Sequence, residues 1–245
     1  MSISSEIERI QTAKSDIITA IENKGVTVPT GATIDELPAL IDSIPSGGGG
    51  SQEYIGIGEF NYKVIQIDNL LWIDSDLKSI LPGIDFPNTL KWDTDPGCVI
   101  YNNDTTTYGI YGQNRGLLYN CRAGEIIQDY LNNNLPGWRI ATVTDWSALI
   151  NFAGGSNNAY KKLCAPILWP NTSSMTNDYG FNAIPTGYVN AGDFVEGSSA
   201  TYFATPISNP TTSSLWIDSG QNYKFWIGNF LYNYSYCAIR LCKDV

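Results

Sequence analysis

The sequence predicts an α+β protein in two parts: a helical segment that self-associates, followed by a larger domain with a few helices and many short strands. Three observations predict this organisation. Isoleucines recur at heptad spacing near the N-terminus, a Gly/Ser run occupies residues 46–51, and two helical patterns precede a long stretch of short strands. We therefore expect an oligomerisation segment at residues 1–45, a linker, natural or engineered, at residues 46–54, and a second domain at residues 55–245.

Composition excludes several classes of function. The 245 residues carry 14 Lys and Arg against 24 Asp and Glu, a formal net charge of −10, so the basic surface that nucleic-acid binding needs is missing. The absence of histidine removes Ser–His–Asp triads, Cys–His dyads and histidine-ligated metals. Neither a membrane-spanning apolar run nor a secretory signal peptide is seen. We expect no nucleic-acid partner and no membrane insertion.

The five cysteines contain no C-x-x-C pair. Zinc sites need more closely spaced ligands, and an odd number of cysteines without a signal peptide favours reduced, buried thiols over a disulfide framework. The cysteines are Cys98, Cys121, Cys164, Cys237 and Cys242.

The N-terminal segment has a narrow apolar stripe at heptad spacing, with one polar member. The stripe consists of Ile3, Ile7, Ile10, Lys14, Ile17 and Ile21. A helix of about 20 residues with so narrow a stripe is marginal alone, and isoleucine at both heptad positions favours three or more helices. We expect a homotrimer; packing of the helix within its own domain is the alternative. Ser4 or Ser5 is expected to cap the helix, and a second short apolar stripe follows from Ile34 to Ile44.

The elements of the second domain follow from local patterns. Strands are expected at residues 62–67 and 70–73, separated by a turn at Asp68 and Asn69. Residues 74–110 are rich in turn-forming residues and are expected to be mostly loop.

Two helices are expected, at residues 125–131 and 143–152. The run of asparagines after residue 131 should stop the first helix, and Thr142 with Asp145 should form a capping box for the second. After residue 156 we expect short strands and almost no helix.

The C-terminal stretch combines aromatic and small polar residues. Tyr and Trp supply large, rigid contact area at low entropic cost, while Asn and Ser supply adaptable hydrogen bonds. A β core with tyrosines at its margin is the alternative interpretation. The candidate ligand-binding residues are Asn222, Tyr223, Lys224, Trp226, Asn229, Tyr232, Asn233 and Tyr234.

Strand alternation predicts which residues share a face. Phe225, Ile227, Leu231 and Ile239 are expected on the inward face, unless a bulge breaks the alternation. Residues 232, 234 and 236 share one parity and are expected on a single aromatic face.

No catalytic or metal centre emerges from the sequence. The pairs Asp74 and Asp76, and Asp93 and Asp95, are expected to be solvated turn carboxylates rather than cation ligands. The other acidic residues are too scattered to nominate a catalytic pair. We expect no catalytic residue, no metal and no cofactor.

Several motifs resemble the Fibrobacter succinogenes major paralogous domain. Residues 136–142 (PGWRIAT), followed by Asp145 and Trp146, resemble its "GWRLPT…EW" signature, with Ala141 in place of the family proline. Further matches to its "YGFSALPGGY", "YWSS" and "SVRCVKD" blocks follow in order, at residues 179–188, 202–205 and 238–244.

This resemblance, over roughly residues 55–245, implies a C-type-lectin-like fold and a relation to the variable proteins of diversity-generating retroelements. In such a fold the ends of the domain pair, so we expect residues 62–67 beside residues 238–242. Calcium-dependent lectins carry E-P-N or Q-P-D together with W-N-D, and neither set occurs here. Residues 6–44 are similar to helical modules of bacteriophage tail-associated and fibre proteins.

These observations favour a non-enzymatic binding protein of a phage tail or cell surface. Its C-terminal aromatic and Asn-rich surface would be diversified and would recognise a host cell-surface protein or glycan. A surface-polysaccharide depolymerase with a scattered carboxylate pair is the alternative.

Overall fold

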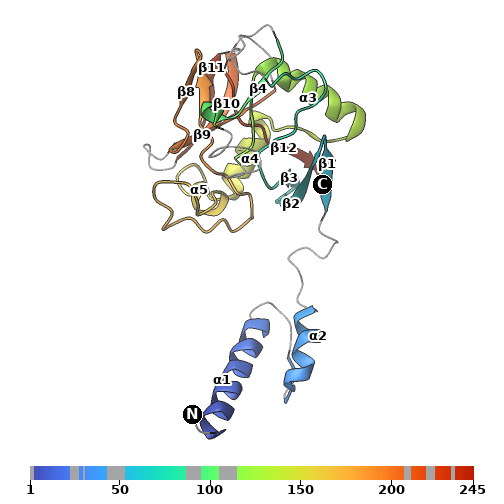
Figure 1. The fold of residues 1–245 in the computed structure, drawn as a ribbon, viewed down its shortest axis with the longest axis vertical. Coiled ribbons are helices and arrows are strands. Elements are labelled where there is room, and N and C mark those ends of the chain that lie inside the picture. The colour runs from blue at the N-terminus through green and yellow to red at the C-terminus, as the bar shows by residue number, and fades with distance from the viewer. Residues whose placement is uncertain are drawn as a thin grey trace. The chain divides into compact units, whose positions relative to one another are not determined.

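A computed structural model gives the structure of the protein. It describes residues 3–22, 28–29, 31–42, 53–86, 95–104, 115–206, 211–218, 224–232 and 235–245. The chain forms two compact units, residues 1–51 and 52–245, which are described separately (Figure 1). The boundary between them falls within the predicted linker, but the last linker residue, Tyr54, already belongs to the first strand of the second unit.

The first unit is a helical hairpin. Its elements are α1 (Ile3–Glu22), the 3-10 turn η1 (Ile34–Glu36) and α2 (Leu37–Asp42). The buried residues Ile21, Val28, Ala32 and Leu37 form its small core. Because α1 begins at Ile3, Ser4 and Ser5 lie inside the helix, and the prediction that one of them caps it is wrong.

The predicted heptad stripe is divided between two environments. Ile21 is only 2% exposed and belongs to the hairpin's own core. In contrast, Ile7, Ile10 and Ile17 are 50%, 49% and 42% exposed. Part of the stripe thus packs within the unit, as the alternative interpretation expected, while the rest stays uncovered in the single chain. Trimerisation remains a prediction.

The second unit begins with a five-stranded sheet of order β1-β2-β3-β12-β6, in which all neighbours are antiparallel. The strands are β1 (Tyr54–Ile57), β2 (Phe60–Ile67), β3 (Leu70–Ile73), β12 (Leu241–Asp244) and β6 (Arg139–Ile140). The predicted strands and the turn at Asp68 and Asn69 are confirmed. Asp68 has a φ of 55°, a conformation that Asp tolerates in tight turns.

The predicted pairing of residues 62–67 with residues 238–242 is wrong. The two-residue turn folds β3 back onto β2, so β3 occupies the place beside β2. Strand β12 then pairs with β3, with Cys242 opposite Trp72. Ala238 instead forms an isolated bridge with Phe203, outside this sheet.

A three-stranded antiparallel sheet of order β11-β10-β9 lies in the later part of the chain. Its strands are β9 (Ala200–Ala204), β10 (Thr211–Asp218) and β11 (Lys224–Tyr232). The shorter elements are β4 (Cys98–Val99), η2 (Tyr101–Asn103), β5 (Leu118–Tyr119), β7 (Tyr188–Asn190) and β8 (Asp193–Val195). Strands β4 and β5 form one hairpin-like pair, and β7 and β8 form another.

Three helices accompany the sheets: α3 (Cys121–Asn134), α4 (Val143–Phe152) and α5 (Ala159–Leu163). The bounds of α4 and its capping box are confirmed. The Asp145 carboxylate accepts hydrogen bonds from the Thr142 N–H at 2.8 Å and from its hydroxyl at 2.7 Å. The five-residue α5 was not expected, because a single turn and a half leaves almost no periodicity in the sequence.

Helix α3 is twice as long as predicted. It starts earlier because the Asn120 side chain caps it, accepting a hydrogen bond from the Ala123 N–H at 3.0 Å. It ends later because the Asn133 and Asn134 side chains donate to carbonyls four residues back, at 2.8 and 2.9 Å. These asparagines therefore form part of the last turn instead of stopping the helix before it.

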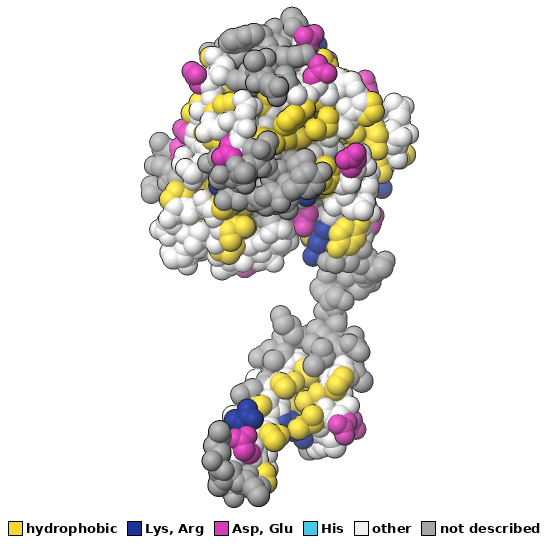
Figure 2. All heavy atoms as spheres, viewed as in Figure 1, with side chains coloured by type: hydrophobic (Ala, Val, Ile, Leu, Met, Phe, Trp, Pro, Cys, Tyr) yellow, Lys and Arg dark blue, Asp and Glu magenta, His cyan; other side chains and the backbone are white. Residues whose placement is uncertain are grey.

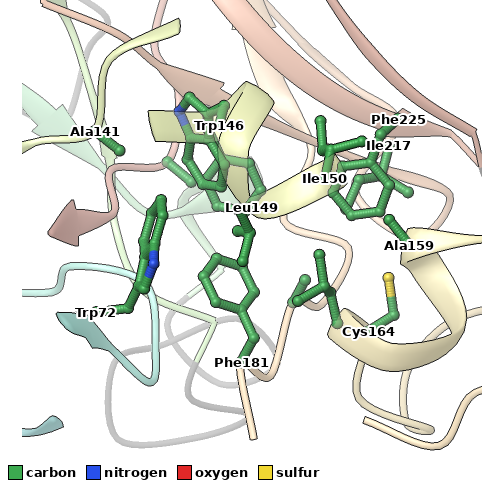
Figure 3. Close-up of a cluster of buried hydrophobic side chains, with 14 of the residues drawn as sticks. Trp72, Ala141, Trp146, Leu149, Ile150, Ala159, Cys164, Phe181, Ile217 and Phe225 are labelled. Carbon is green, nitrogen blue, oxygen red and sulfur yellow. The ribbon is translucent and has the colours of Figure 1, made fainter. Parts of the chain in front are cut away.

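The main core lies between the two larger sheets, around α4 (Figure 1). Trp146 of α4 packs against Trp72 of β3, with ring centroids 5.1 Å apart, and against Phe203 of β9 at 4.9 Å. Ile217 and Phe225 approach the same cluster from β10 and β11 (Figure 3). The second unit thus combines helices and sheets, which confirms the α+β class.

Residues of the family signature hold this fold together. Arg139 of β6 bridges Asp145 of α4 at 2.7 Å and Asp244 of β12 at 2.8 Å. Partial burial would raise the pKa of Asp145, but the hydrogen bonds from Arg139 and Thr142 outweigh it and lower that pKa. The "GWR" arginine is therefore a structural residue.

The second signature arginine, Arg240, is fully buried and forms an ion pair with Asp76 at 2.5 Å. Its guanidinium lies 4.3 Å from the centroid of the Phe181 ring and donates to the Phe181 carbonyl at 2.6 Å. Burial raises the pKa of Asp76, and Arg240 offsets part of that rise. The prediction that Asp76 is a solvated turn carboxylate is therefore wrong.

Candidate ligand-binding surface

The three-stranded sheet has two different faces. Phe203, Ile217 and Phe225 are at most 2% exposed and belong to the main core. Successive residues of a strand point to opposite sides, so Tyr202, Trp216 and Trp226 lie on the other face. The register agrees, because Trp216 lies opposite both Tyr202 and Trp226.

Four aromatic rings form a continuous row on this outer face. From Tyr188 of β7 to Tyr202 the ring centroids are 4.1 Å apart, from Tyr202 to Trp216 6.0 Å, and from Trp216 to Trp226 5.7 Å. The last three rings are nearly parallel, with interplanar angles of 4° and 17°. We call these four residues, Tyr188, Tyr202, Trp216 and Trp226, the aromatic row.

Exposure increases from Tyr202 toward the end of the aromatic row on β11, while Tyr188 at the other end is partly buried. Tyr202 is 9% exposed, Trp216 is partly buried, and Trp226 is 41% exposed. Among the described residues, β11 is an edge strand of its sheet. The row ends there in Trp226, a large aromatic side chain that stacks on Trp216 and is 41% exposed.

Charged side chains flank the aromatic row. The Tyr202 hydroxyl donates to a carboxylate oxygen of Glu196 at 3.2 Å. Partial burial and the nearby charge of Asp218 raise the pKa of Glu196. Lys224 lies opposite Asp218 in the strand register and, two residues from Trp226, on the same face. The row thus has hydrogen-bond acceptors and one cation beside it.

Of the eight predicted binding residues, the structure describes the side chains of two, Lys224 and Trp226, and it places both on the outer face. Asn229 and Tyr232 have their backbones in β11, but their side chains lie outside the described residues. Asn222, Tyr223, Asn233 and Tyr234 also lie outside the described residues.

The predicted inward residues agree with the structure where it describes them. Phe225 is 2% and Ile239 1% exposed, and Ile227 packs partly buried against the core. A register shift between Thr212 and Ser213 places a bulge in the partner strand after Asn229. The alternation is therefore reset there, and the face of Tyr232 does not follow from that of Trp226.

Tyr236 does not belong to the predicted aromatic face. It is 1% exposed, lies beyond β11 and forms a bridge with Val189, within the main core. Parity was misleading because the chain leaves β11 before this residue. Conversely, sequence reasoning missed Tyr188 and Tyr202 as members of the outer face, since only the cross-strand register brings them beside Trp216.

The described residues show no arrangement typical of thiol or metal catalysis. Burial raises the pKa of Cys98 to about 12 and also raises the pKa values of Cys164, Cys237 and Cys242. No disulfide joins the five cysteines, all of which are described. Within the described ranges, no group of three or more Cys, Asp or Glu side chains is placed to hold a metal ion. Nor is any helix there both long and apolar enough to cross a membrane.

Comparison with known proteins gives one result. The sequence profile of the Fibrobacter succinogenes major domain matches residues 65–242, which is most of the chain. Searches of curated proteins and of solved structures found no match. The matched range contains both signature arginines and the four strands, β7, β9, β10 and β11, that carry the aromatic row. The chain therefore belongs to the Fibrobacter succinogenes major domain family.

Proposed function

We propose that this protein is a non-enzymatic binding protein whose second unit, with a C-type-lectin-like fold, recognises a cell-surface protein or glycan of a host bacterium. In this proposal the molecule is displayed on a phage tail or a cell surface, and retroelement mutagenesis diversifies the C-terminal stretch. The observation that carries the proposal is the aromatic row, which ends in Trp226 at 41% exposure on an edge strand.

The chemistry of the row suits recognition. Tyr and Trp bury large areas with few rotatable bonds, and they are enriched among the residues that dominate binding energy. Three of the four rings are stacked on one another, so little conformational entropy is lost when a ligand covers them. The remaining predicted binding residues adjoin or belong to the same strand β11; they are Asn222, Tyr223, Asn229, Tyr232, Asn233 and Tyr234.

A binding screen of the second unit against the surfaces of candidate host bacteria tests the proposal. Trp226→Ala should weaken binding by on the order of 1–3 kcal/mol, and Tyr232→Ala and Tyr234→Ala should do the same. Phe152→Ala is the matched control, because Phe152 is 45% exposed on the end of α4, outside the aromatic row. Equal binding by the Trp226 and Phe152 variants would contradict the proposal.

The first unit would supply a stalk. We propose that it forms a homotrimer through the exposed isoleucines of α1, as in the phage fibre modules that it resembles. Figure 2 shows hydrophobic side chains gathered on the face of this unit that is turned to the viewer. Ile7, Ile10 and Ile17, together with Ile34 at 52% exposure, are the large exposed apolar residues described there.

Light scattering tests the stalk. The full chain should have the mass of a trimer, and removal of residues 1–46 should leave a folded monomer. Ile10→Lys should dissociate the trimer, because it removes an exposed isoleucine from the stripe and adds a second layer of ammonium groups to that of Lys14, whereas Gln11→Lys on the neighbouring exposed position should not. A monomeric full chain at micromolar concentration would refute the stalk.

One observation favours the alternative function, a polysaccharide depolymerase. The Glu196 carboxyl, with its raised pKa, interacts with Asp218 beside the aromatic row, and a glycosidase uses two carboxyl groups in different protonation states. Glu196→Gln and Asp218→Asn should then each abolish the shortening of a surface polysaccharide. The binding proposal expects no such shortening from the unmodified protein.

A further inference from the structure

A pocket of about 220 Å³ opens between helix α3, the end of β9 and residues 235–239. A pocket of this size can hold one small organic group. Ala204 and Cys237 form part of its wall, and they also pack in one cluster with Tyr202 and Trp216. The pocket therefore adjoins the middle of the aromatic row, at Tyr202 and Trp216.

The walls of the pocket are apolar at depth. Ile239 is 1% and Ile140 3% exposed, and Cys237 beside them is 2% exposed. A bound aliphatic chain would pack against these side chains and would bring no polar group that needs a hydrogen bond. The depth of the pocket thus suits an alkyl group.

The charge at the mouth is negative. Glu125 and Asp129 lie one helical turn apart on α3 and both line the pocket, while none of its described lining residues is Lys or Arg. Glu125 already forms an ion pair with Arg122 at 2.9 Å. Asp129 forms no ion pair with any described residue, so its carboxylate is the group that a bound cation would neutralise.

Gly124 keeps this space open. It lies inside α3, where glycine is about 1 kcal/mol less favourable than alanine. A Cβ atom at this position would meet only the Ile140 Cδ1 atom, at 3.9 Å, so packing does not demand glycine here. A large side chain at position 124 would extend into the pocket that Gly124 lines.

From the apolar depth, the carboxylate mouth and the size, we infer that this pocket binds an alkylammonium group, such as a lysine side chain or a small free amine. The alkyl chain would pack against Ile140 and Ile239, and the ammonium would lie at Asp129. This inference concerns a second site and does not require that the aromatic row binds a receptor.

Titration of the full chain with pentylammonium, followed by amide NMR signals of Gly124, Gln128 and Ser235, tests the inference. We expect saturable shifts with pentylammonium and at least tenfold weaker binding of pentan-1-ol, its neutral counterpart. Asp129→Asn should weaken pentylammonium binding on the order of tenfold, the loss of one charged hydrogen bond. Asp193→Asn, an exposed acid on β8 that does not line the pocket, is the matched control.

Two further arms complete the design. Gly124→Leu should abolish pentylammonium binding by filling the pocket, while Gly124→Ala should retain it. If the leucine variant does not fold, the Asp129→Asn variant still tests the inference. A blocked Gly-Lys-Gly peptide that binds at least as well as pentylammonium would identify a protein lysine as the source of the group, and binding of the free amine alone would identify a small molecule.

Pentan-1-ol binding as tightly as pentylammonium would overturn the inference, as would equal effects of the Asp129 and Asp193 variants. Trp226 does not line the pocket, so Trp226→Ala should leave pentylammonium binding unchanged. The proposed function and this inference therefore fail separately.

Discussion

The two faces of the sheet formed by β9, β10 and β11 carry different kinds of aromatic surface. On the inner face, Phe203 and Phe225 are at most 2% exposed and have no polar atoms in their side chains. On the outer face, the Tyr202 hydroxyl donates a hydrogen bond to Glu196, and Trp226 is 41% exposed. In each of these strands, alternate residues therefore pack in the core, and the residues between them lie on the outer face.

This difference shows how a binding surface can vary without loss of the fold. Alternation separates the two sets completely in a regular strand, so a change at Trp226 need not disturb Phe225 beside it. The Arg240 ion pair and the Arg139 bridge involve no residue of these three strands. If the proposed function holds, stability and recognition depend on different residues of one sheet.

The largest effect is expected at the buried residue Arg240. Arg240→Met would leave Asp76 as a buried carboxylate without its partner and should lower the free energy of unfolding by about 3–5 kcal/mol. Denaturant unfolding measures this loss. Arg122→Met, which breaks the exposed pair with Glu125, should cost about 0–1 kcal/mol. Similar losses for the two variants would contradict a structural role specific to Arg240.

The next effect compares neighbours on opposite faces. Phe225→Ala should lower the free energy of unfolding by about 3 kcal/mol, the lower end for a buried Phe, because the edge strand can relax into the cavity. Trp226→Ala should lower it by less than about 1 kcal/mol, since its ring is half-exposed. Denaturant unfolding measures both losses. Equal losses of unfolding free energy for the two variants would contradict the difference between the two faces.

Local patterns predicted the elements that are determined locally. The capping box at Thr142 fixed the start of α4, and the turn at Asp68 fixed the β2–β3 hairpin. The start of α3 was missed because Asn120, its cap, lies five residues before the predicted start. The resemblance was sound at the level of the family, and the profile match confirms that membership.

The relations between distant residues could not be read from the sequence in the same way. Asp76 lies in a stretch of turn residues, and only its contact with Arg240, 164 positions later, makes it a core residue. Tyr188 joins Tyr202 and Trp216 through strand packing, which no local spacing indicates. Of the candidate site, the sequence therefore predicted Trp226, at the β11 end of the aromatic row, and missed Tyr188 and Tyr202.

A smaller effect is expected from Glu196, the carboxyl beside the aromatic row. Its pKa is raised in the folded state, so the folded protein gains stability from its protonated form at low pH and loses that contribution as pH rises through the raised pKa. Glu196→Gln cannot titrate but still accepts the Tyr202 hydroxyl. Between about pH 4 and 7, the melting temperature of the Glu196→Gln variant should therefore fall less, or rise more, with increasing pH than that of the unmodified protein. Parallel pH profiles would show that Glu196 is solvated like an ordinary surface acid.

The smallest effect concerns the thiols, and it tests how firmly the outer face is packed. Cys237 is 2% exposed and lies in one cluster with Tyr202, directly beneath the aromatic row, whereas Cys121 on α3 is partly exposed. The thiolate is the reactive form, and burial raises the pKa values of Cys98, Cys164, Cys237 and Cys242. A thiol reagent should therefore modify Cys121 in the native protein and the other four only after unfolding. Because no disulfide is present, a reductant should leave the melting temperature unchanged. Rapid labelling of Cys237 would mean that the outer face opens readily, and the rigid support that we assign to the aromatic row would then be wrong.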